Sequence, residues 1–327
     1  MRSFTNYLLK RVVINIIVFF VVVTLTFLIF RLLGNPITMM IGPGAPPETA
    51  QLLTKEFGLD KPLWEQYILF WMNLFKGNLG MSFVFTGESV INVIFPTRFL
   101  NTIILMGTGL FSSILISLIL GLYSAKNYNG YLDKFMSIFT GILISIPSFW
   151  LAMIVLLSFG YYLGWIPMGG TISLSAINKP IFFYILDYLY HLIGPFITIT
   201  LFFLSSNFLI TRGTAYRVFQ EDYIKALKLF GIKQNKIIFH HALKNSILPE
   251  LSQIAVQMSY LISGAIFTET VFSLNGMGSL IYTAVVNLDY PVLQGVFIFM
   301  TIVVIVSNFT ADILYGIIDP RVRLGLV

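Results

Sequence analysis

The chain has 327 residues, of which 57% are hydrophobic and only 10% are charged, and its formal net charge is +6. A soluble domain of this length cannot hide so much apolar surface behind so few charges, so the composition excludes an ordinary soluble protein and predicts a membrane protein. The absence of cysteine excludes a disulfide scaffold, a thiolate metal site and a cysteine nucleophile.

Six windows between charged residues are apolar enough for a helix that crosses the hydrocarbon core, which takes about 20 residues. The first window follows a short basic stretch and is too long for the apolar region of a signal peptide, so we expect it to remain as a membrane span. Pro147 and Pro195 fall inside or near spans, where neighbouring helices are expected to compensate for the lost backbone hydrogen bond. The sequence predicts an all-α membrane protein, one domain over residues 1–327, with spans at residues 12–33, 98–126, 134–163, 187–212, 248–269 and 291–318.

The distribution of Lys and Arg predicts the orientation of these spans. With the N-terminus inside, fourteen of these residues lie on the cytoplasmic side and six on the opposite side. Loops rich in Lys and Arg stay in the cytoplasm, and six spans return the chain to its starting side. We therefore expect a multi-pass protein of the inner membrane with both termini in the cytoplasm.

Residues 34–99 form an extracytoplasmic insertion in this topology. Proline at a helix start and glycine just past its end predict one short helix that ends at Gly58 and another from Pro62 to Gly77. One face of the second helix carries Leu63, Tyr67, Phe70, Trp71 and Leu74. Its aromatic residues fit either a lateral helix in the membrane interface or an ordinary packed loop helix.

The fourth span is unusually polar for a membrane helix. Its polar residues could line a translocation path, which we favour slightly, or could only hydrogen-bond to neighbouring helices. These residues are Thr198, Thr200, Ser205, Ser206 and Asn207.

The cytoplasmic loop of residues 212–246 carries the most information. Asp222 is a candidate N-cap, and Gly231 stands where a helix would end. Apolar residues recur between them at helical spacing, at Tyr223, Ala226, Leu227 and Phe230. A helix of about two turns is unstable alone in water, so it needs a groove on its own protein or on a partner.

A second helical stretch, at about residues 236–246, leads back to the membrane. The loop holds seven basic residues and two acidic ones. From periodicity alone, a rigid lever pushed by a cytoplasmic partner and an amphipathic hairpin lying on anionic lipid are equally favoured.

Two carboxylates lie at or inside spans, where an ionised group is expensive. Asp312 is expected to cap a helix or pair with a basic residue such as Arg321. Glu269 could help form an outer gate or could equally pair with a neighbouring loop.

The sequence offers no catalytic site. His191, His240 and His241 lack metal-ligand spacing, which predicts structural roles and no metal site. No glycine-rich phosphate loop ending in Lys-Ser or Lys-Thr occurs, so the chain is not expected to be an ATPase.

The loop resembles the segment that defines the permease subunits of binding-protein-dependent, ATP-binding cassette importers. The run DYIKALKLFG at residues 222–231 and the run HALKNSILP at residues 241–249 carry the resemblance. The eighteen-position step from Gly231 to Pro249 is similar to the dipeptide, oligopeptide and nickel branch. Further family-like pieces occur in order at residues 30–36, 57–67, 77–80, 146–150, 269–272, 276–278, 289–291, 312 and 319–321.

The resemblance implies a non-enzymatic permease subunit that forms half of a translocation pathway. In that family the loop holds a coupling helix that docks into a cleft on an ATPase. Here that helix would be formed by Asp222, Tyr223, Ala226, Leu227, Phe230 and Gly231. The gate or path would involve Glu269, Ser205, Ser206 and Asn207.

The expected partners are a second homologous permease, two ATPase subunits, an extracytoplasmic substrate-binding protein and membrane lipid, with no nucleic acid. ATP and Mg would be bound by the ATPase subunits, and this chain would hold no cofactor. Peptides are the expected substrate; oligosaccharides and nickel or other metal chelates are alternatives within the family.

Three residues depart from the family pattern. Leu227 and Phe230 stand where alanine and lysine are usual, which implies a matching cleft on this protein's own ATPase. Asn275 stands where proline is usual, which puts the local geometry of that outer loop in doubt.

Two other classes are disfavoured. An ion-coupled secondary transporter would need paired ionisable residues near the bilayer midplane and an inverted repeat. A membrane-embedded enzyme would need a clustered acid–base or metal set, which the histidine spacing does not supply.

Overall fold

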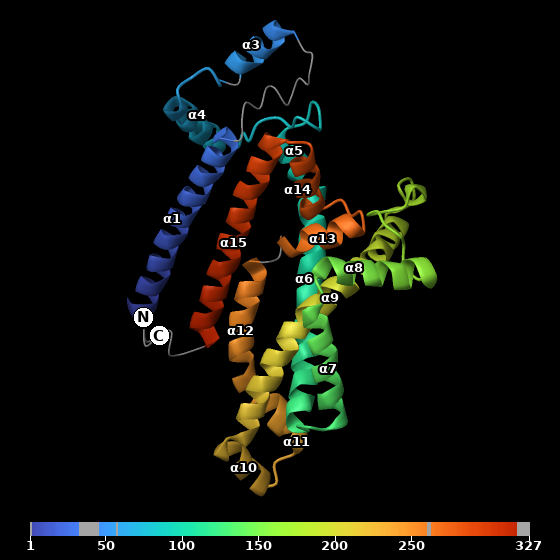
Figure 1. Cartoon of the computed structure of the whole chain (residues 1–327). Coiled ribbons are helices and arrows are strands. Elements are labelled where there is room, and N and C mark those ends of the chain that lie inside the picture. Colours follow the sequence, from blue (N-terminus) through green and yellow to red (C-terminus); the bar gives the residue numbers. More distant parts are fainter. Residues whose placement is uncertain (1, 33–45, 57, 260–262, 319–327) are drawn as a thin grey trace.

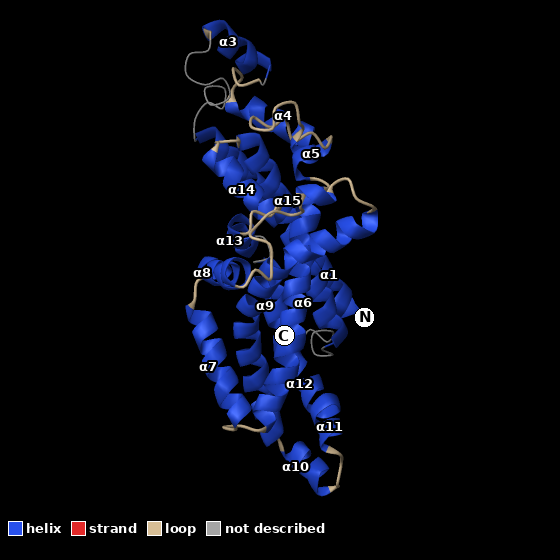
Figure 2. Ribbon diagram, turned by 90° about the vertical axis from the view of Figure 1, so that its right-hand side faces the viewer, coloured by secondary structure: helices blue, strands red, loops and turns tan. Residues whose placement is uncertain are grey.

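The computed structural model describes residues 2–32, 46–56, 58–259 and 263–318, and the regular elements in these residues are helices. Figures 1 and 2 show an elongated bundle with α3 at one end and α10 at the other. We call these the α3 end and the α10 end. The all-α prediction is confirmed.

In the described part of the chain, four helices are long and apolar enough to cross a membrane. They correspond to the first, second, fourth and sixth predicted spans, and α9 extends beyond its predicted window at both ends. The helices are α1 (Arg2–Leu32), α6 (Thr97–Lys126), α9 (Ile181–Gln220) and α15 (Tyr290–Ile318). In the described residues, α1 packs against α15 and α6 packs against α9.

The third predicted span is not one continuous helix. Helix α7 (Tyr131–Ser145) ends before Pro147. A bend of 110° separates it from α8 (Ser148–Val155), which continues into the π-helix η1 (Leu156–Tyr162). Proline has no amide hydrogen and disfavours the helical conformation in the residue before it. Ile146 is accordingly extended, with φ −90° and ψ 124°. The chain therefore breaks at Pro147, and the prediction of one continuous third span was wrong.

The fifth predicted span also divides. Helix α12 (Leu243–Ser259) starts before the expected position and is followed by α13 (Ser263–Val271), with residues 260–262 outside the described part. Figure 1 shows α13 turned across the direction of α12. The described residues thus hold four spanning helices, or five if α7 and α8 count as one bent span, in place of the predicted six.

Helices α6 and α9 run parallel and meet at two glycines. A Cβ on Gly109 would lie 2.5 Å from Ile199 Cγ2, and a Cβ on Gly121 would lie 2.8 Å from Thr211 Cγ2. In both contacts the residue of α9 follows the glycine of α6 by the same number of positions in the sequence, so the two helices run in the same direction. Small residues allow such close backbone approach inside a membrane.

Replacing Gly109 with alanine is expected to lower the stability by about 1–3 kcal/mol, because the added methyl overpacks the interface with α9. The control is Gly107→Ala on the same helix, where a Cβ would meet no atom within 4 Å. Thermal unfolding of the purified chain in detergent measures the difference. Equal midpoints for the two variants would contradict this packing.

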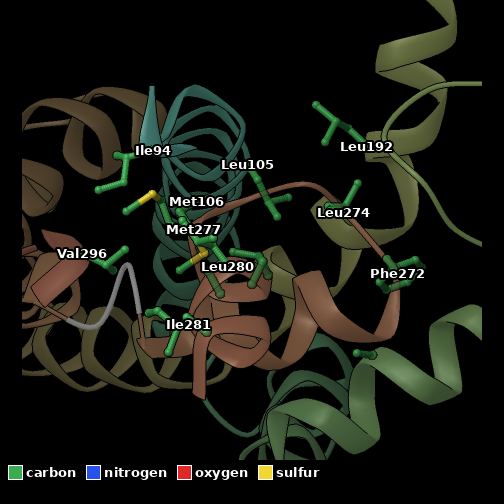
Figure 3. Packing of buried hydrophobic residues seen from close by; sticks show 14 of the residues in the cluster. Ile94, Leu105, Met106, Leu192, Phe272, Leu274, Met277, Leu280, Ile281 and Val296 are labelled. Carbon is green, nitrogen blue, oxygen red and sulfur yellow. The ribbon is translucent and has the colours of Figure 1, made fainter. Parts of the chain in front are cut away.

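The main apolar core lies where α6, α13, α14 (Met277–Val286) and α15 converge. Figure 3 shows Leu105 and Met106 facing Met277 and Leu280, with Phe272 at the edge toward α8. All five side chains are at most 2% exposed. This packing fixes the position of the outer turn between α13 and α14.

A buried ion pair joins α7 to α9. The Arg212 guanidinium donates through Nε to Asp133 Oδ1 and through a second nitrogen to Asp133 Oδ2 at 2.8 Å. The ring of Tyr128 lies 5.1 Å from the guanidinium carbon. A bidentate pair of this kind fixes the geometry of two helices as well as their contact.

The predicted insertion forms α3 (Pro47–Glu56), α4 (Leu63–Phe75) and α5 (Val90–Ile94). Both helix starts agree with the predicted prolines, and Gly77 follows α4 with φ +74°. One face of α4 packs against α1, through contacts such as Tyr67 Oη with Thr24 Oγ1 at 2.7 Å. The opposite face is exposed, and a location of α4 in the membrane interface stays a prediction.

Asp312 pairs with a basic residue, but not with the one named from the sequence. Its carboxylate lies 3.2 Å from Arg11 Nε, which joins α15 to α1. Arg321 lies outside the described residues.

Candidate functional site

Helix α10 (Asp222–Leu229) stands at one end of the molecule, as the lowest element in Figure 1. Its N-cap position is Glu221, so the prediction that Asp222 is the N-cap was wrong. Asp222 lies in the first turn, where a carboxylate is favourable to the helix dipole. The Lys225 ammonium donates to it at 2.8 Å and thereby lowers the pKa of Asp222.

The end of α10 has the geometry expected from Gly231. Gly231 N–H donates to Lys228 O, and Ile232 N–H donates to Leu227 O, both at 3.1 Å. Gly231 has φ +71°, which residues with a side chain rarely adopt. These bonds form a Schellman motif, and Leu227 and Ile232 both pack against the buried apolar cluster beneath it.

The residue that anchors α10 to the bundle is Ile224, which the sequence analysis did not name. Its side chain is fully buried. It packs in a cluster with Phe219 of α9 and Leu122 of α6, and Leu227 covers the edge of this cluster. The predicted apolar face is therefore divided. Leu227 packs against the apolar cluster around Ile224, whereas Tyr223 and Phe230 are not part of that cluster.

The remaining side of α10 presents an apolar tip to the exterior. Leu229 is 88% exposed and Phe230 is 81% exposed. Tyr223 is partly exposed, and its hydroxyl accepts a hydrogen bond from Asn245 Nδ2 at 2.6 Å. Ala226 is half-buried. We call Tyr223, Ala226, Leu229 and Phe230 the α10 tip; the helix beneath it is held rigidly by Ile224.

The polar residues of α9 form a joint with α6 and α12. Gln257 Nε2 donates to Asn207 Oδ1 at 2.5 Å and to Ser206 Oγ at 3.1 Å. Asn207 Nδ2 donates in turn to Ser113 Oγ at 3.0 Å. Asn207 is thus occupied by contacts between helices, which was one of the two roles considered for it.

Ser205 and Ser206 also line a hollow of about 500 Å³ between α7, α9 and α12. Gln253 and Gln257 supply its other amide groups, and the rest of the lining is mainly apolar. Gln257 Oε1 is buried without a hydrogen-bond partner in the described residues. The hollow therefore carries unused hydrogen-bonding capacity and no charge.

Glu269 is 1% exposed and holds the start of α14. Its Oε2 accepts from Gly278 N–H at 2.8 Å and from Ser279 N–H at 3.1 Å. Its Oε1 accepts from the Thr102 hydroxyl of α6 at 2.5 Å. The carboxylate therefore binds the first turn of α14 and α6 instead of a loop, and a role in an outer gate stays a prediction.

Glu250 is a buried carboxyl that the sequence analysis missed. It is fully buried between α6, α9 and α12, where the Thr211 hydroxyl donates to it at 3.0 Å and Ser117 lies at 3.5 Å. It directly follows Pro249 at the expected start of the fifth span, and that position was its only signal.

Asn275 organises the outer turn in a way that proline could not. Its N–H donates to Thr171 Oγ1 at 2.8 Å, and its Oδ1 accepts from Arg98 Nε at 2.9 Å. Asn101 Nδ2 donates to its carbonyl oxygen at 2.7 Å. The geometry that the departure placed in doubt is thus held by three hydrogen bonds.

Among the described residues, no group of three His, Asp or Glu residues could hold a metal ion.

Two family models match the chain. The description "binding-protein-dependent transport system inner membrane component" matches residues 117–324, and the corresponding N-terminal model matches residues 4–103. A probable peptide ABC transporter permease protein of Sinorhizobium fredii is 32% identical over 97% of this chain and 99% of the relative. The oligopeptide transport system permease protein AppB of Bacillus subtilis is 30% identical over the same shares, and the di/tripeptide transport system permease protein DppB of Pseudomonas aeruginosa is 32% identical over 97% and 98%.

Proposed function

The chain belongs to the family of binding-protein-dependent transport system inner membrane components, and from this membership we propose that it is the permease subunit of an importer that carries peptides. The similarity covers nearly the whole chain, and the relatives named above are described as peptide, oligopeptide and di/tripeptide permeases. The chain is a transmembrane component of an ABC importer of the dipeptide and oligopeptide branch.

The exposed tip of α10 carries the proposal that the chain is driven by a separate ATPase. Leu229 and Phe230 are bulky, apolar and almost fully exposed, a combination that marks an interaction site. Ile224 fixes the helix to α6 and α9, so a push on the tip reaches the spanning helices as a rigid movement. A cytoplasmic ATPase that closes on ATP would supply this push, with ATP and Mg bound in the ATPase subunits.

The hollow beside Ser205 and Ser206 supports the assignment of the translocation path. Hydroxyl and amide groups can bond to any peptide backbone, while the absence of charge avoids selecting for one side chain. The second wall of the path would come from a homologous permease subunit. A binding protein outside the membrane would deliver the peptide at the α3 end.

This arrangement requires the α10 end to face the cytoplasm. The excess of Lys and Arg on that side supports this orientation, in which both termini would lie in the cytoplasm. The test introduces one cysteine within residues 232–236 and another near Gly87 and measures which of the two is accessible from outside the cell. The native chain has no cysteine that would react in their place.

The direct test of the function is reconstitution in liposomes. The chain alone is expected to translocate no peptide, with or without ATP, because its sequence lacks the glycine-rich phosphate loop of an ATPase. Together with its partner permease, both ATPase subunits and the binding protein, it should accumulate labelled peptide only when ATP is present. Uptake by the chain alone would contradict the proposal, and uptake of an oligosaccharide in place of peptide would change the substrate class.

A further inference from the structure

A half-buried cation lies at the end of α1 beside α4. Arg31 is in the last turn of α1, and its guanidinium carbon lies 5.4 Å from the centre of the Phe27 ring. Among the described residues, no carboxylate lies within ion-pair distance of Arg31. A partly enclosed guanidinium without a counter-charge is a strong donor for an anionic group such as phosphate.

Two hollows meet at Arg31. The larger, of about 400 Å³, lies between α1, α4, the chain at residues 78–81 and the start of α15. The smaller, of about 120 Å³, shares Arg31 and Gln294 with it. A hollow of about 300 Å³ or more is within the usual range for a small-molecule site.

Gln66 of α4 supplies the second feature of the site. It is 9% exposed and lines the larger hollow. Its Nε2 donates to Lys61 O at 2.7 Å and to Leu59 O at 3.2 Å, which fixes the amide so that Oε1 is the free atom. Gln66 Oε1 is buried and has no hydrogen-bond partner in the described residues. Because an unsatisfied acceptor is costly, a ligand in the hollow that donates a hydrogen bond to Gln66 would be favoured over one that cannot.

The surroundings indicate a membrane lipid as the source of that ligand. The face of α4 that turns away from α1 is apolar and exposed, with side chains between half and three-quarters exposed at Leu63, Trp64, Ile68, Met72 and Phe75. A helix with an exposed apolar face at the end of a spanning helix lies at the level of the lipid headgroups. Figure 1 shows α4 against the upper end of α1, and the hollow is lined by residues of both helices.

We propose that this hollow binds the headgroup of a phospholipid from the leaflet on the α3 side. The phosphate would accept hydrogen bonds from the Arg31 guanidinium. An ethanolamine ammonium or a glycerol hydroxyl of the same headgroup would donate to Gln66 Oε1. The phosphate of phosphatidylcholine would also accept from Arg31, but its choline group has no N–H or O–H to donate to Gln66, so the site would discriminate among lipids. This binding does not depend on which solute the importer carries.

The test measures lipid retention on the full-length chain. The chain is purified through nanodiscs made from equal parts of phosphatidylethanolamine, phosphatidylglycerol and phosphatidylcholine, and is then extracted into mild detergent. Mass spectrometry of the retained lipid is expected to show the first two enriched about tenfold over phosphatidylcholine, because only they complete the bond to Gln66. This measurement requires no variant, and equal retention of all three lipids would overturn the proposal.

Two variants then locate the site. Arg31→Gln is expected to reduce retained lipid about tenfold, while Arg31→Lys should keep part of it. The matched control is Lys76→Gln, which removes an exposed cation at the end of α4 and should leave retention unchanged. If Lys76→Gln has the same effect as Arg31→Gln, the binding is general surface attraction and the assignment is wrong.

Competition separates the lipid from other anions. Inorganic phosphate and a zwitterionic dipeptide, each added in excess during extraction, are expected to leave the lipid bound. Displacement by the dipeptide would assign the hollow to peptide, and displacement by phosphate would assign it to free anions. Either result would overturn the lipid assignment.

Discussion

Replacement of Phe230 by aspartate is expected to abolish transport and to release the ATPase subunits from the membrane. Phe230 is 81% exposed and lies outside the apolar cluster around Ile224, so the change leaves the fold of α10 intact. A charge at this position would be desolvated in any apolar cleft that receives the α10 tip. Losing a central aromatic contact costs about 2 kcal/mol or more, which is about 30-fold in affinity.

The measurement is the amount of ATPase subunit that copurifies with the membrane-bound permease, together with peptide uptake by the complete importer. The matched control is Tyr131→Asp, since Tyr131 is 97% exposed at the start of α7 but is not part of α10. The Tyr131→Asp variant should retain both the copurifying ATPase and peptide uptake. Full association of the ATPase with the Phe230→Asp variant would contradict docking at the α10 tip and would favour the alternative in which the loop lies on lipid.

The sequence predicted the length of α10 but not which of its faces is buried. Gly231 marks the helix end because the chain needs a positive φ there, which is a local requirement. Burial is a tertiary property. Ile224 and Phe230 are both large and apolar, and only the positions of α6 and α9 decide that the first is enclosed and the second is exposed.

The spans were predicted well where a helix is continuous and poorly where it breaks. Between Arg98 and Lys126 the apolar window contains no proline, and α6 occupies it fully. Pro195 lies inside α9 without ending it, whereas Pro147 ends α7 and the chain turns by 110°. The two prolines are alike in the sequence, so the outcome depends on the packing that each helix can reach.

For the polar residues in the spans, too, the sequence indicated the residue type but not the tertiary partners. The sequence left two roles open for Ser205, Ser206 and Asn207, a path or hydrogen bonds to neighbouring helices. Ser206 and Asn207 do bond to Gln257 of α12, a helix far away in the sequence, whereas the Ser205 hydroxyl donates to Phe202 O of its own helix. Glu269 likewise has a distant partner in Thr102 of α6. Glu250 was overlooked because its burial depends on three helices that meet only in the folded chain.

Replacement of Glu269 is the second change for which we expect a large effect, here on stability. Its two oxygens accept three hydrogen bonds, two from the first turn of α14 and one from Thr102 of α6. Replacing Glu269 with alanine would leave three buried donors without an acceptor, each at a cost of about 1–3 kcal/mol. We expect a loss of stability of about 3 kcal/mol or more, measured as a lower unfolding temperature and a lower yield of folded protein.

Glu269→Gln separates this structural role from a role in gating. Glutamine has nearly the same shape, and its carbonyl oxygen can still accept from Gly278 and Ser279, so the stability should fall by only about 1 kcal/mol. If the carboxylate acts only through these contacts, peptide uptake by the complete importer will stay close to the wild-type rate. If uptake is lost while the unfolding temperature is kept, the negative charge itself is required, and the gate hypothesis for Glu269 is then the one that holds.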